Sequence, residues 1–358
     1  MAAIVPYGPT AARDRQRPGH EVRPASTTVD IHSHVWSVAA AEVVAQASAT
    51  GRAAIDSQSV GATQAIMARQ VADRRPLQIE WQRRLPDLDA MAIDLQILTP
   101  VPAQMYQGLD ERIAMTATRL VNDNIAAIVG ECPGRFAGVG TVPLEHIDAA
   151  AEELDRLVTR LGLRGVQIPT NIGGRDPSAE EFAAFWATAE RLGTVVFLHP
   201  TGFTQPDRLK RFYLNNTIGN PLETTIALHT LILDGVLERH PALKLVAAHG
   251  GAFAAAYSGR MDHAWGARAD ANAELPHPPS SYLRRVYFDS LVFTPHQLSY
   301  LVSTFGADHV LMGTDYPADM GDYDPVSLVM QSGLDAADAA AVAGGNALRL
   351  LGLAPRAA

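Results

Sequence analysis

Short apolar runs alternate with longer segments of helical spacing along most of the chain, and this alternation constrains the fold more than any other feature. Eight runs read as strands, at residues 27–32, 94–99, 136–142, 165–168, 194–199, 243–249, 286–289 and 310–313. Segments between them, such as 110–130 and 146–162, place apolar residues on one helical face. Near-continuous apolar runs are typical of parallel strands that are buried on both faces. We therefore predict an α/β fold of the (β/α)8 type, a TIM-like barrel.

A doubly wound open sheet is the alternative, because it has the same alternation of strands and helices. Its usual signature is a glycine-rich phosphate loop directly after the first strand. No such loop follows residues 27–32, and the count of eight strands is that of a barrel. Both observations favour the barrel.

The length of 358 residues suits one large domain of this kind. Residues 1–26 are rich in Pro, Arg, Gly and Ala and have no apolar periodicity, so we predict an N-terminal tail that is disordered or lies along a neighbouring subunit. Residues 27–358 are predicted to form a single barrel domain. Within this domain, residues 37–84 indicate a small helical insertion after the first strand.

The overall composition excludes several classes of protein. The formal net charge of -9 argues against a nucleic-acid-binding protein, because such proteins usually present a basic face. The single cysteine, Cys132, excludes an internal disulfide framework and a cysteine-rich zinc module. No apolar run reaches membrane-spanning length, and the first residues lack the apolar core of a signal peptide. We therefore expect a cytoplasmic protein without a nucleic-acid or membrane partner.

Five polar side chains stand at the carboxyl ends of the apolar runs. His32 and His34 are two residues apart, so both side chains point to the same side of an extended segment. His199, His249 and Asp315 end the fifth, sixth and eighth runs. In a barrel the carboxyl ends of the strands form one face, which carries the active site. We therefore expect the five side chains to meet at one site.

This combination of side chains predicts a metal centre. Neutral imidazole and carboxylate groups bind Zn²⁺, and also Fe²⁺, Mn²⁺ or Co²⁺. The ligands that we predict are His32, His34, His199 and Asp315. A catalytic metal keeps one position open for water or substrate, and a set of four protein ligands leaves that position. We expect one divalent metal ion, with zinc as the leading choice.

His249 has a separate predicted role. It is either a further ligand or, as we favour, a general acid–base group, because histidine exchanges protons near neutral pH. Asp315 can combine metal binding with proton transfer. Asp289, at the end of the seventh run, either orients a ligand histidine or caps a loop. The other histidines are expected to be structural or exposed: His20, His146, His229, His240, His263, His277, His296 and His309.

Four motifs around these residues resemble the amidohydrolase superfamily, and within it the branch typified by aminocarboxymuconate-semialdehyde decarboxylase. They are Asp30-Ile31-His32-Ser33-His34, His199-Pro200, Ala248-His249-Gly250-Gly251 and Gly313-Thr314-Asp315-Tyr316-Pro317. The resemblance extends from about Val29 to Leu353. It implies a (β/α)8 barrel without an organic cofactor, in which His249 is the acid–base residue and one metal ion, usually zinc, is held by His32, His34, His199 and Asp315.

The resemblance also implies a homodimer or larger homo-oligomer, in which Arg260 reaches into the neighbouring subunit's site and holds a substrate carboxylate. A second substrate arginine of the branch falls upstream of the second strand, where the candidates are Arg69, Arg74 and Arg75, unless these are surface charges. The branch has Trp after its His-Pro motif, whereas this chain has Thr201. The substrate is therefore expected to differ from the semialdehyde itself.

Most characterised members of this branch remove CO₂ from unsaturated or aromatic carboxylic acids. The leading hypothesis is therefore a metal-dependent, non-oxidative decarboxylase (a carboxy-lyase) of a small aromatic or unsaturated acid. A hydrolase of a lactone, amide or ester, or a hydratase, is the alternative, because the same metal-bound hydroxide would serve it. A non-catalytic binding protein is disfavoured, since a degenerate barrel is expected to lose its strand-end ligands.

Overall fold

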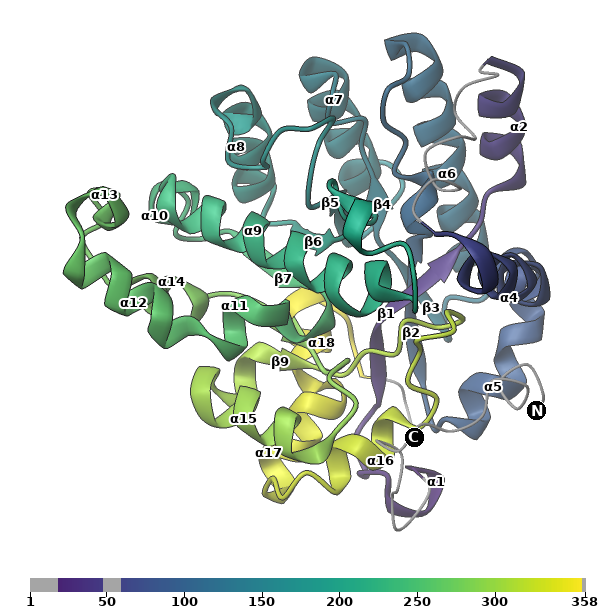
Figure 1. Ribbon diagram of the computed structural model, residues 1–358. Helices are drawn as coiled ribbons and strands as arrows, with labels where there is room; N and C mark the ends of the chain where they lie inside the picture. Colours follow the sequence, from purple (N-terminus) through teal and green to yellow (C-terminus); the bar gives the residue numbers. More distant parts are fainter. Residues whose placement is uncertain (1–18, 48–58, 356–358) are drawn as a thin grey trace.

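The computed structural model describes residues 19–47 and 59–355 and consists of alternating strands and helices. Figure 1 shows the strands at the centre of the molecule with helices around them. Each predicted strand is present with small shifts at its ends, and the third is divided at Val139 into two, which confirms the α/β class. The strands are β1 (Val29–Val35), β2 (Leu95–Pro100), β3 (Phe136–Gly138), β4 (Gly140–Thr141), β5 (Gly165–Pro169), β6 (Val195–His199), β7 (Lys244–Ala247), β8 (Tyr287–Asp289) and β9 (Val310–Leu311).

The helices cover the strands. They are α1 (Gly19–Val22), α2 (Val38–Ala47), α4 (Gly61–Ile79), α5 (Leu85–Ala90), α6 (Glu111–Glu131), α7 (Ile147–Thr159), α8 (Ala183–Leu192), α9 (Asn220–Leu233), α10 (Val236–Arg239), α11 (Ala252–Ala256), α12 (Ser258–Ala267), α13 (Ala269–Asn272), α14 (Pro279–Leu283), α15 (Pro295–Phe305), α16 (Pro325–Met330), α17 (Ala336–Ala340) and α18 (Asn346–Leu351). Val121 of α6 and Leu154 of α7 pack in one core cluster with Val166 of β5, so the apolar helical faces cover the strands as predicted. Within the described residues, no helix is long and apolar enough to cross a membrane.

All paired strands are parallel. β1, β2 and β3 form one sheet, and β4 to β9 form a second sheet in sequential order. The Val139 amide, between β3 and β4, donates to the carbonyl oxygen of Leu98 (2.9 Å), so the first sheet remains bonded up to the start of the second. β1, β2, β5 and β6 are buried along their whole length. This burial explains why their sequences are apolar runs without polar alternation.

Backbone hydrogen bonds also join β1 to the segment that follows β9. The amide of His34 donates to the carbonyl oxygen of Tyr316 (2.7 Å). In the opposite direction, the amide of Asp315 donates to the carbonyl oxygen of His32 (2.8 Å). The first strand and the last segment therefore lie side by side, and this pairing places Asp315 beside the two histidines of β1.

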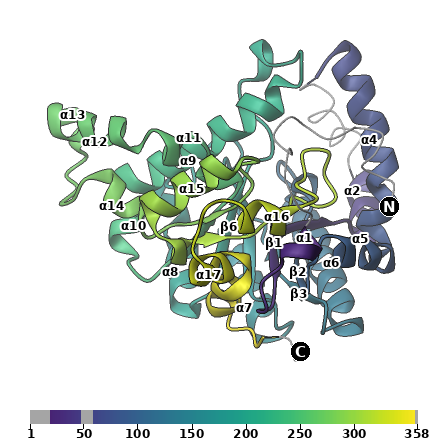
Figure 2. The ribbon, with the colours of Figure 1, turned by 90° about the horizontal axis from the view of Figure 1, so that it is seen from below.

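Residues 37–84 are helical where the structure describes them. α2 and α4 fall in this range, and the 3-10 turn Trp81–Arg84 ends it, while residues 48–58 lie outside the described part. In Figures 1 and 2, α4 lies on the side of the molecule opposite to α12 and α13, which extend away from the strands. Of the predicted tail, residues 1–18 lie outside the described residues. Its last part includes α1, in which the Gly19 amide donates to Asp324 Oδ1 (2.9 Å) beside α16.

The packing of the C-terminal region on the start of β1 yields a first prediction. In the π-helical turn Ala341–Gly345, a Cβ atom at Gly344 would overlap the carbonyl oxygen of Thr27. Because that oxygen belongs to the backbone, we expect Gly344→Ala to lower the free energy of unfolding by about 1–3 kcal/mol. Gly345→Ala is the matched control, since its Cβ would meet only the Ala340 carbonyl oxygen at 3.5 Å. Urea unfolding measures the difference; equal losses in both variants would contradict this packing.

Candidate metal centre

Four of the predicted site residues converge at the carboxyl ends of the strands. His32 and His34 extend from β1, His199 ends β6, and Asp315 follows β9. One ligand atom from each residue lies within 4.8 Å of the others, and all four residues are buried. Residues that are far apart in the sequence thus form one compact group, because parallel strands bring their carboxyl ends to the same face.

The inward-facing atoms of this group are suited to a cation. His34 Nε2 lies 2.9 Å from Asp315 Oδ1, and His32 Nε2 lies 3.5 Å from the same oxygen. His199 Nε2 is buried and has no hydrogen-bond partner among the described residues. A buried polar atom without a partner costs free energy, whereas a metal ion at the centre of the group would coordinate it. Three nitrogens and one carboxylate oxygen are a donor set that fits a divalent metal.

The outward-facing nitrogen of each ligand histidine has an acceptor. The acceptors are Asp289 Oδ2 for His32 (2.7 Å), the carbonyl oxygen of Pro100 for His34 (3.0 Å) and the carbonyl oxygen of Pro200 for His199 (2.8 Å). A carbonyl oxygen only accepts, so Nδ1 of His34 and Nδ1 of His199 carry the proton. The Nε2 lone pairs of these rings are then directed at the centre of the group, which is the usual arrangement around a metal.

The ionisation states of the group also suit metal binding. Burial raises the pKa of Asp315, but the neighbouring rings of His32 and His34 outweigh it and bring the pKa to about 2. Burial lowers the pKa of His34 and holds that of His199 well below its usual value. At neutral pH the group therefore contains an ionised carboxylate and neutral imidazoles at His34 and His199, the forms that bind metals.

The buried charges around the histidines leave a deficit of positive charge. The carboxylates of Asp30, Asp289 and Asp315 are buried, and the guanidinium of Arg84 is buried in the same network. One guanidinium does not balance three carboxylates, and a proton on His32, which pairs with Asp289 (2.7 Å), would balance only one more. Buried charges are stable only when they are paired or bound to metals, and a divalent cation would balance this group.

His249 lies beside the ligand group and outside it. The residue follows β7 in a tight turn with φ of 57°, and its Nε2 is 4.0 Å from Asp315 Oδ2. Its Nδ1 is buried without a partner among the described residues, and burial lowers its pKa. This position is compatible with the acid–base role that the sequence favours over ligation. Gly250, which follows in the left-handed region, packs so tightly on Val292 that a Cβ atom would overlap it.

Asp289 performs both of the tasks that the sequence left as alternatives. Its Oδ2 accepts from Nδ1 of His32 (2.7 Å), which orients a ligand ring. The same carboxylate also accepts backbone amides of the next loops, from His249 (2.9 Å), Gly250 (2.7 Å) and Leu291 (3.1 Å). Asp289 therefore ties the ligand group to the turn that carries His249.

A cavity of about 400 Å³ opens beside His249 and Asp315. Its walls come from the start of α9, from α11 and from residues 291–301. They are largely apolar, with Phe253, Leu291 and Leu301 among them. A cavity with apolar walls and a few polar groups is typical of a small-molecule site. No arginine is among the described residues that line it.

The candidate substrate arginines therefore lie outside this cavity. Arg260 is exposed on α12, and Arg69 is exposed on α4 in an ion pair with Asp73 (3.8 Å). The guanidinium of Arg75 lies 3.4 Å from the ring centroid of Trp36. Arg74 is buried. Within one chain the structure does not bring any of the four to the cavity wall.

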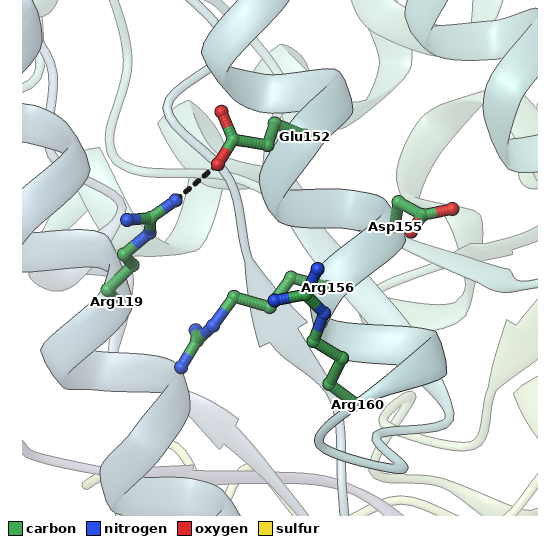
Figure 3. A pocket seen from close by; sticks show the side chains of 5 residues that line it. All are labelled: Arg119, Glu152, Asp155, Arg156 and Arg160. Atoms are coloured by element: carbon green, nitrogen blue, oxygen red, sulfur yellow. Dashed lines mark hydrogen bonds and ion pairs between the residues drawn. The ribbon is translucent and has the colours of Figure 1, made fainter.

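Figure 3 shows a second cavity, of about 310 Å³, between α6 and α7. Its walls are charged, and Arg119 pairs with Glu152 across it (2.5 Å). Arg119 also pairs with the buried Glu153 (3.2 Å), which accepts from Arg156 (2.8 Å). These ion pairs join α6 to α7, and the predicted site residues lie elsewhere.

Several residues that shape the metal centre were not predicted. Asp30 was part of the quoted first motif but had no assigned role, although its spacing places it on the same side of β1 as His32 and His34. Its carboxylate accepts from the hydroxyl of Thr314 (2.6 Å) and the side chain of Gln96 (2.8 Å). The carbonyl acceptors of the histidine rings are backbone atoms, so no residue type in the sequence could have identified them.

A family model described as Amidohydrolase matches residues 29–353. The chain therefore belongs to the amidohydrolase family, as its motifs indicated. The 2-amino-3-carboxymuconate-6-semialdehyde decarboxylase of Dictyostelium discoideum is 34% identical over 274 residues, which cover 76% of this chain and 76% of that protein. The gamma-resorcylate decarboxylase of Rhodococcus jostii (strain RHA1) is 31% identical over 260 residues, which cover 65% of this chain and 76% of that protein.

A solved structure supports the fold. The 5-carboxyvanillate decarboxylase of Novosphingobium aromaticivorans, complexed with manganese and 4-hydroxy-3-methoxy-5-nitrobenzoic acid, aligns with a TM-score of 0.79. The alignment has 22% sequence identity and covers 92% of this chain and 97% of that chain. The shared fold thus agrees with the α/β architecture of this chain.

The role of Asp289 yields a second prediction. Asp289→Asn removes the charge that faces His32 Nδ1, so we expect the affinity for Mn²⁺ or Zn²⁺ to fall by about 10–100-fold. Asp94→Asn is the control, because Asp94 precedes β2 and accepts from the amide of Thr28 (2.9 Å). Titration against a chelator measures both affinities. Unchanged affinity in the Asp289 variant would show that this carboxylate does not tune the site.

Proposed function

We propose that this chain is a metal-dependent, non-oxidative decarboxylase of a small aromatic or unsaturated carboxylic acid. The observation that carries the proposal is the buried group of three histidines and one aspartate, which stands next to His249 at the wall of a cavity. Relatives at 34% and 31% identity that are named decarboxylases support the reaction type. The fold proposed with it is a closed eight-stranded barrel, supported by the hydrogen bonds between β1 and the segment after β9.

The metal that we propose is a single Zn²⁺ or Mn²⁺ ion. Zinc is the prediction from the sequence, and a solved structure of similar fold holds manganese. Both ions accept imidazole and carboxylate ligands, so the donor set alone does not choose between them. The cytoplasmic location stays a prediction from the sequence.

A divalent cation held by these four residues would supply a Lewis acid that attracts substrate oxygen atoms and stabilises developing negative charge. The residues of the chain would bind the substrate, exclude water and transfer the proton. The apolar wall of the cavity would hold the body of the acid and exclude water from it. When the bond to the carboxylate breaks, its electron pair stays on the substrate carbon and CO₂ leaves. His249 or Asp315 would then relay a proton from water to that carbon, which completes a C–H bond.

A hydrolase or hydratase is the second candidate, because the same metal and the same proton carriers would serve it. His249 would then transfer a proton to or from water, and the product would gain the mass of water. The mass of the product therefore separates the two reactions: the decarboxylase releases CO₂, and the hydrolase adds water.

Release of CO₂ from a panel of hydroxybenzoic and unsaturated acids tests the proposal, with the protein loaded with Mn²⁺ or Zn²⁺. We expect CO₂ and a product with a new C–H bond. His249→Asn is expected to lower kcat by about 10²–10⁴-fold with unchanged metal content, because a positioned proton carrier supplies a gain of that size. His296→Asn, which changes an exposed histidine of α15, is the control. Addition of water without CO₂ release would overturn the proposal in favour of the hydrolase.

We also propose that the chain acts as a homodimer in which Arg260 completes the site of the neighbouring subunit. Arg260 is exposed on α12 and does not line its own cavity. Large apolar side chains near it are exposed as well, with Tyr257 at 69% and Phe253 at 39%. Exposed apolar residues that gather near a cavity are typical of an interaction surface. Of the arginines upstream of β2, Arg74 and Arg75 are the candidates for a second substrate contact.

Mixed dimers test the placement of Arg260. His249→Asn and Arg260→Ala variants are each expected to be nearly inactive alone. Co-expression of the two should restore about a quarter of wild-type activity, because half of the dimers are mixed and each mixed dimer has one intact site. An arginine that served its own subunit would give no recovery, since every site would then contain a defect.

A further inference from the structure

Arg84 is a buried cation that contacts the chain segments of the metal ligands. Neither the sequence analysis nor the proposed reaction gives it a role. It ends the 3-10 turn Trp81–Arg84 between α4 and α5, and its side chain is 0% exposed. A buried guanidinium is costly unless its donors are satisfied. Its Nε donates to the carbonyl oxygen of Leu77 (2.9 Å), and its Nη1 donates to Gln96 Oε1 (2.7 Å). Arg84 therefore connects the helical segment before β2 to the centre of the sheet.

The remaining contacts of Arg84 reach the chain segments that carry three of the four ligands. Its Nη2 donates to the carbonyl oxygen of His34, and its Nη1 lies 3.4 Å from Ser33 Oγ, both at the end of β1. The guanidinium also lies 5.0 Å from the ring centroid of Tyr316, the residue after Asp315. One planar group thus touches both the strand of the two histidines and the turn of the aspartate.

A second set of hydrogen bonds extends this contact to the other side of the ligands. Gln96, which accepts from Arg84, donates through its Nε2 to Asp30 Oδ2 (2.8 Å). The Asp30 carboxylate in turn accepts from the backbone amides of His32 (3.0 Å) and Thr314 (3.0 Å). The network therefore holds the backbone of β1 and of the turn at Asp315 from both sides. Asp30 also compensates the charge of Arg84 inside the protein.

We propose that Arg84 is a positioning residue for the metal site, which holds the end of β1 and the turn at Asp315 in the ligating arrangement before a metal binds. The inference rests on the proposed metal site and not on the reaction that the metal serves. A guanidinium is required because its donors point in fixed directions toward acceptors on several segments. A lysine carries the same charge, but its three donors share one atom and cannot reach all of these acceptors.

The test is the metal affinity of Arg84→Lys, measured by titration of Mn²⁺ against a chelator. We expect a loss of about tenfold or more, the size seen when a residue that supports metal ligands is changed. Arg135→Lys is the matched control, because Arg135 also donates to backbone carbonyls, of Asp94 (3.1 Å) and Ile93 (3.1 Å), at the amino end of β2. Thermal unfolding of both metal-free variants reports any general loss of stability.

A purely structural role predicts a different pattern from a positioning role. Arg84→Lys would then lose stability, as the control does, with metal affinity within about twofold of wild type, and this result would overturn the proposal. If metal affinity falls while no acid is decarboxylated, the proposed function fails and the role of Arg84 stands.

A measurement on the unaltered protein covers the case in which Arg84→Lys does not fold. Hydrogen exchange is followed by mass spectrometry with and without Mn²⁺, in peptides that cover residues 32–34 and 312–316. We expect both segments to stay protected after the metal is removed, because their backbone pairing and the contacts of Arg84 and Asp30 already hold them. Exchange as fast as in exposed loops, once the metal is removed, would show that the metal itself orders the ligands and would overturn the proposal.

Discussion

The pairing of β1 with the segment after β9 is the interaction on which the site depends. The amides of Ile31 and His34 donate to the carbonyl oxygens of Met312 (2.9 Å) and Tyr316 (2.7 Å), and the chain between these carbonyls contains Asp315. Without this pairing, the aspartate would have no fixed position relative to the two histidines of β1. The other strands then add one element each: β6 brings His199, and β8 brings Asp289, which anchors the turn of His249.

The same arrangement explains how so many polar groups can be buried at one end of the strands. Each ligand ring donates outward to a carboxylate or a carbonyl oxygen, and each inner nitrogen faces the centre of the group. Burial raises the pKa of Asp30 to about 6, although hydrogen bonds from Thr314, Gln96 and the amide of His32 oppose this shift. Arg84 keeps its charge at neutral pH, because burial lowers its pKa only to about 10. The remaining negative charge makes a divalent cation the natural occupant.

Much of this could be predicted from the sequence, for a physical reason. Parallel strands are buried on both faces and appear as apolar runs, so His32, His199 and Asp315 stood out as polar residues at the ends of such runs. Arg84 could not be assigned in this way, and the sequence left Asp289 between two alternative roles. Their roles depend on which strands become neighbours and on backbone acceptors, and neither is visible as a residue type. The substrate contacts that we propose for the arginines are harder still to predict, since Arg260 is exposed in one chain and its proposed contact needs a second copy.

X-ray diffraction from crystals grown with Mn²⁺, with data collected at the manganese absorption edge, tests the central claim most directly. The account predicts one strong anomalous peak inside the protein, surrounded by Nε2 of His32, His34 and His199 and by a carboxylate oxygen of Asp315. A peak at another position, or no peak from protein that is saturated with the metal, would contradict the account.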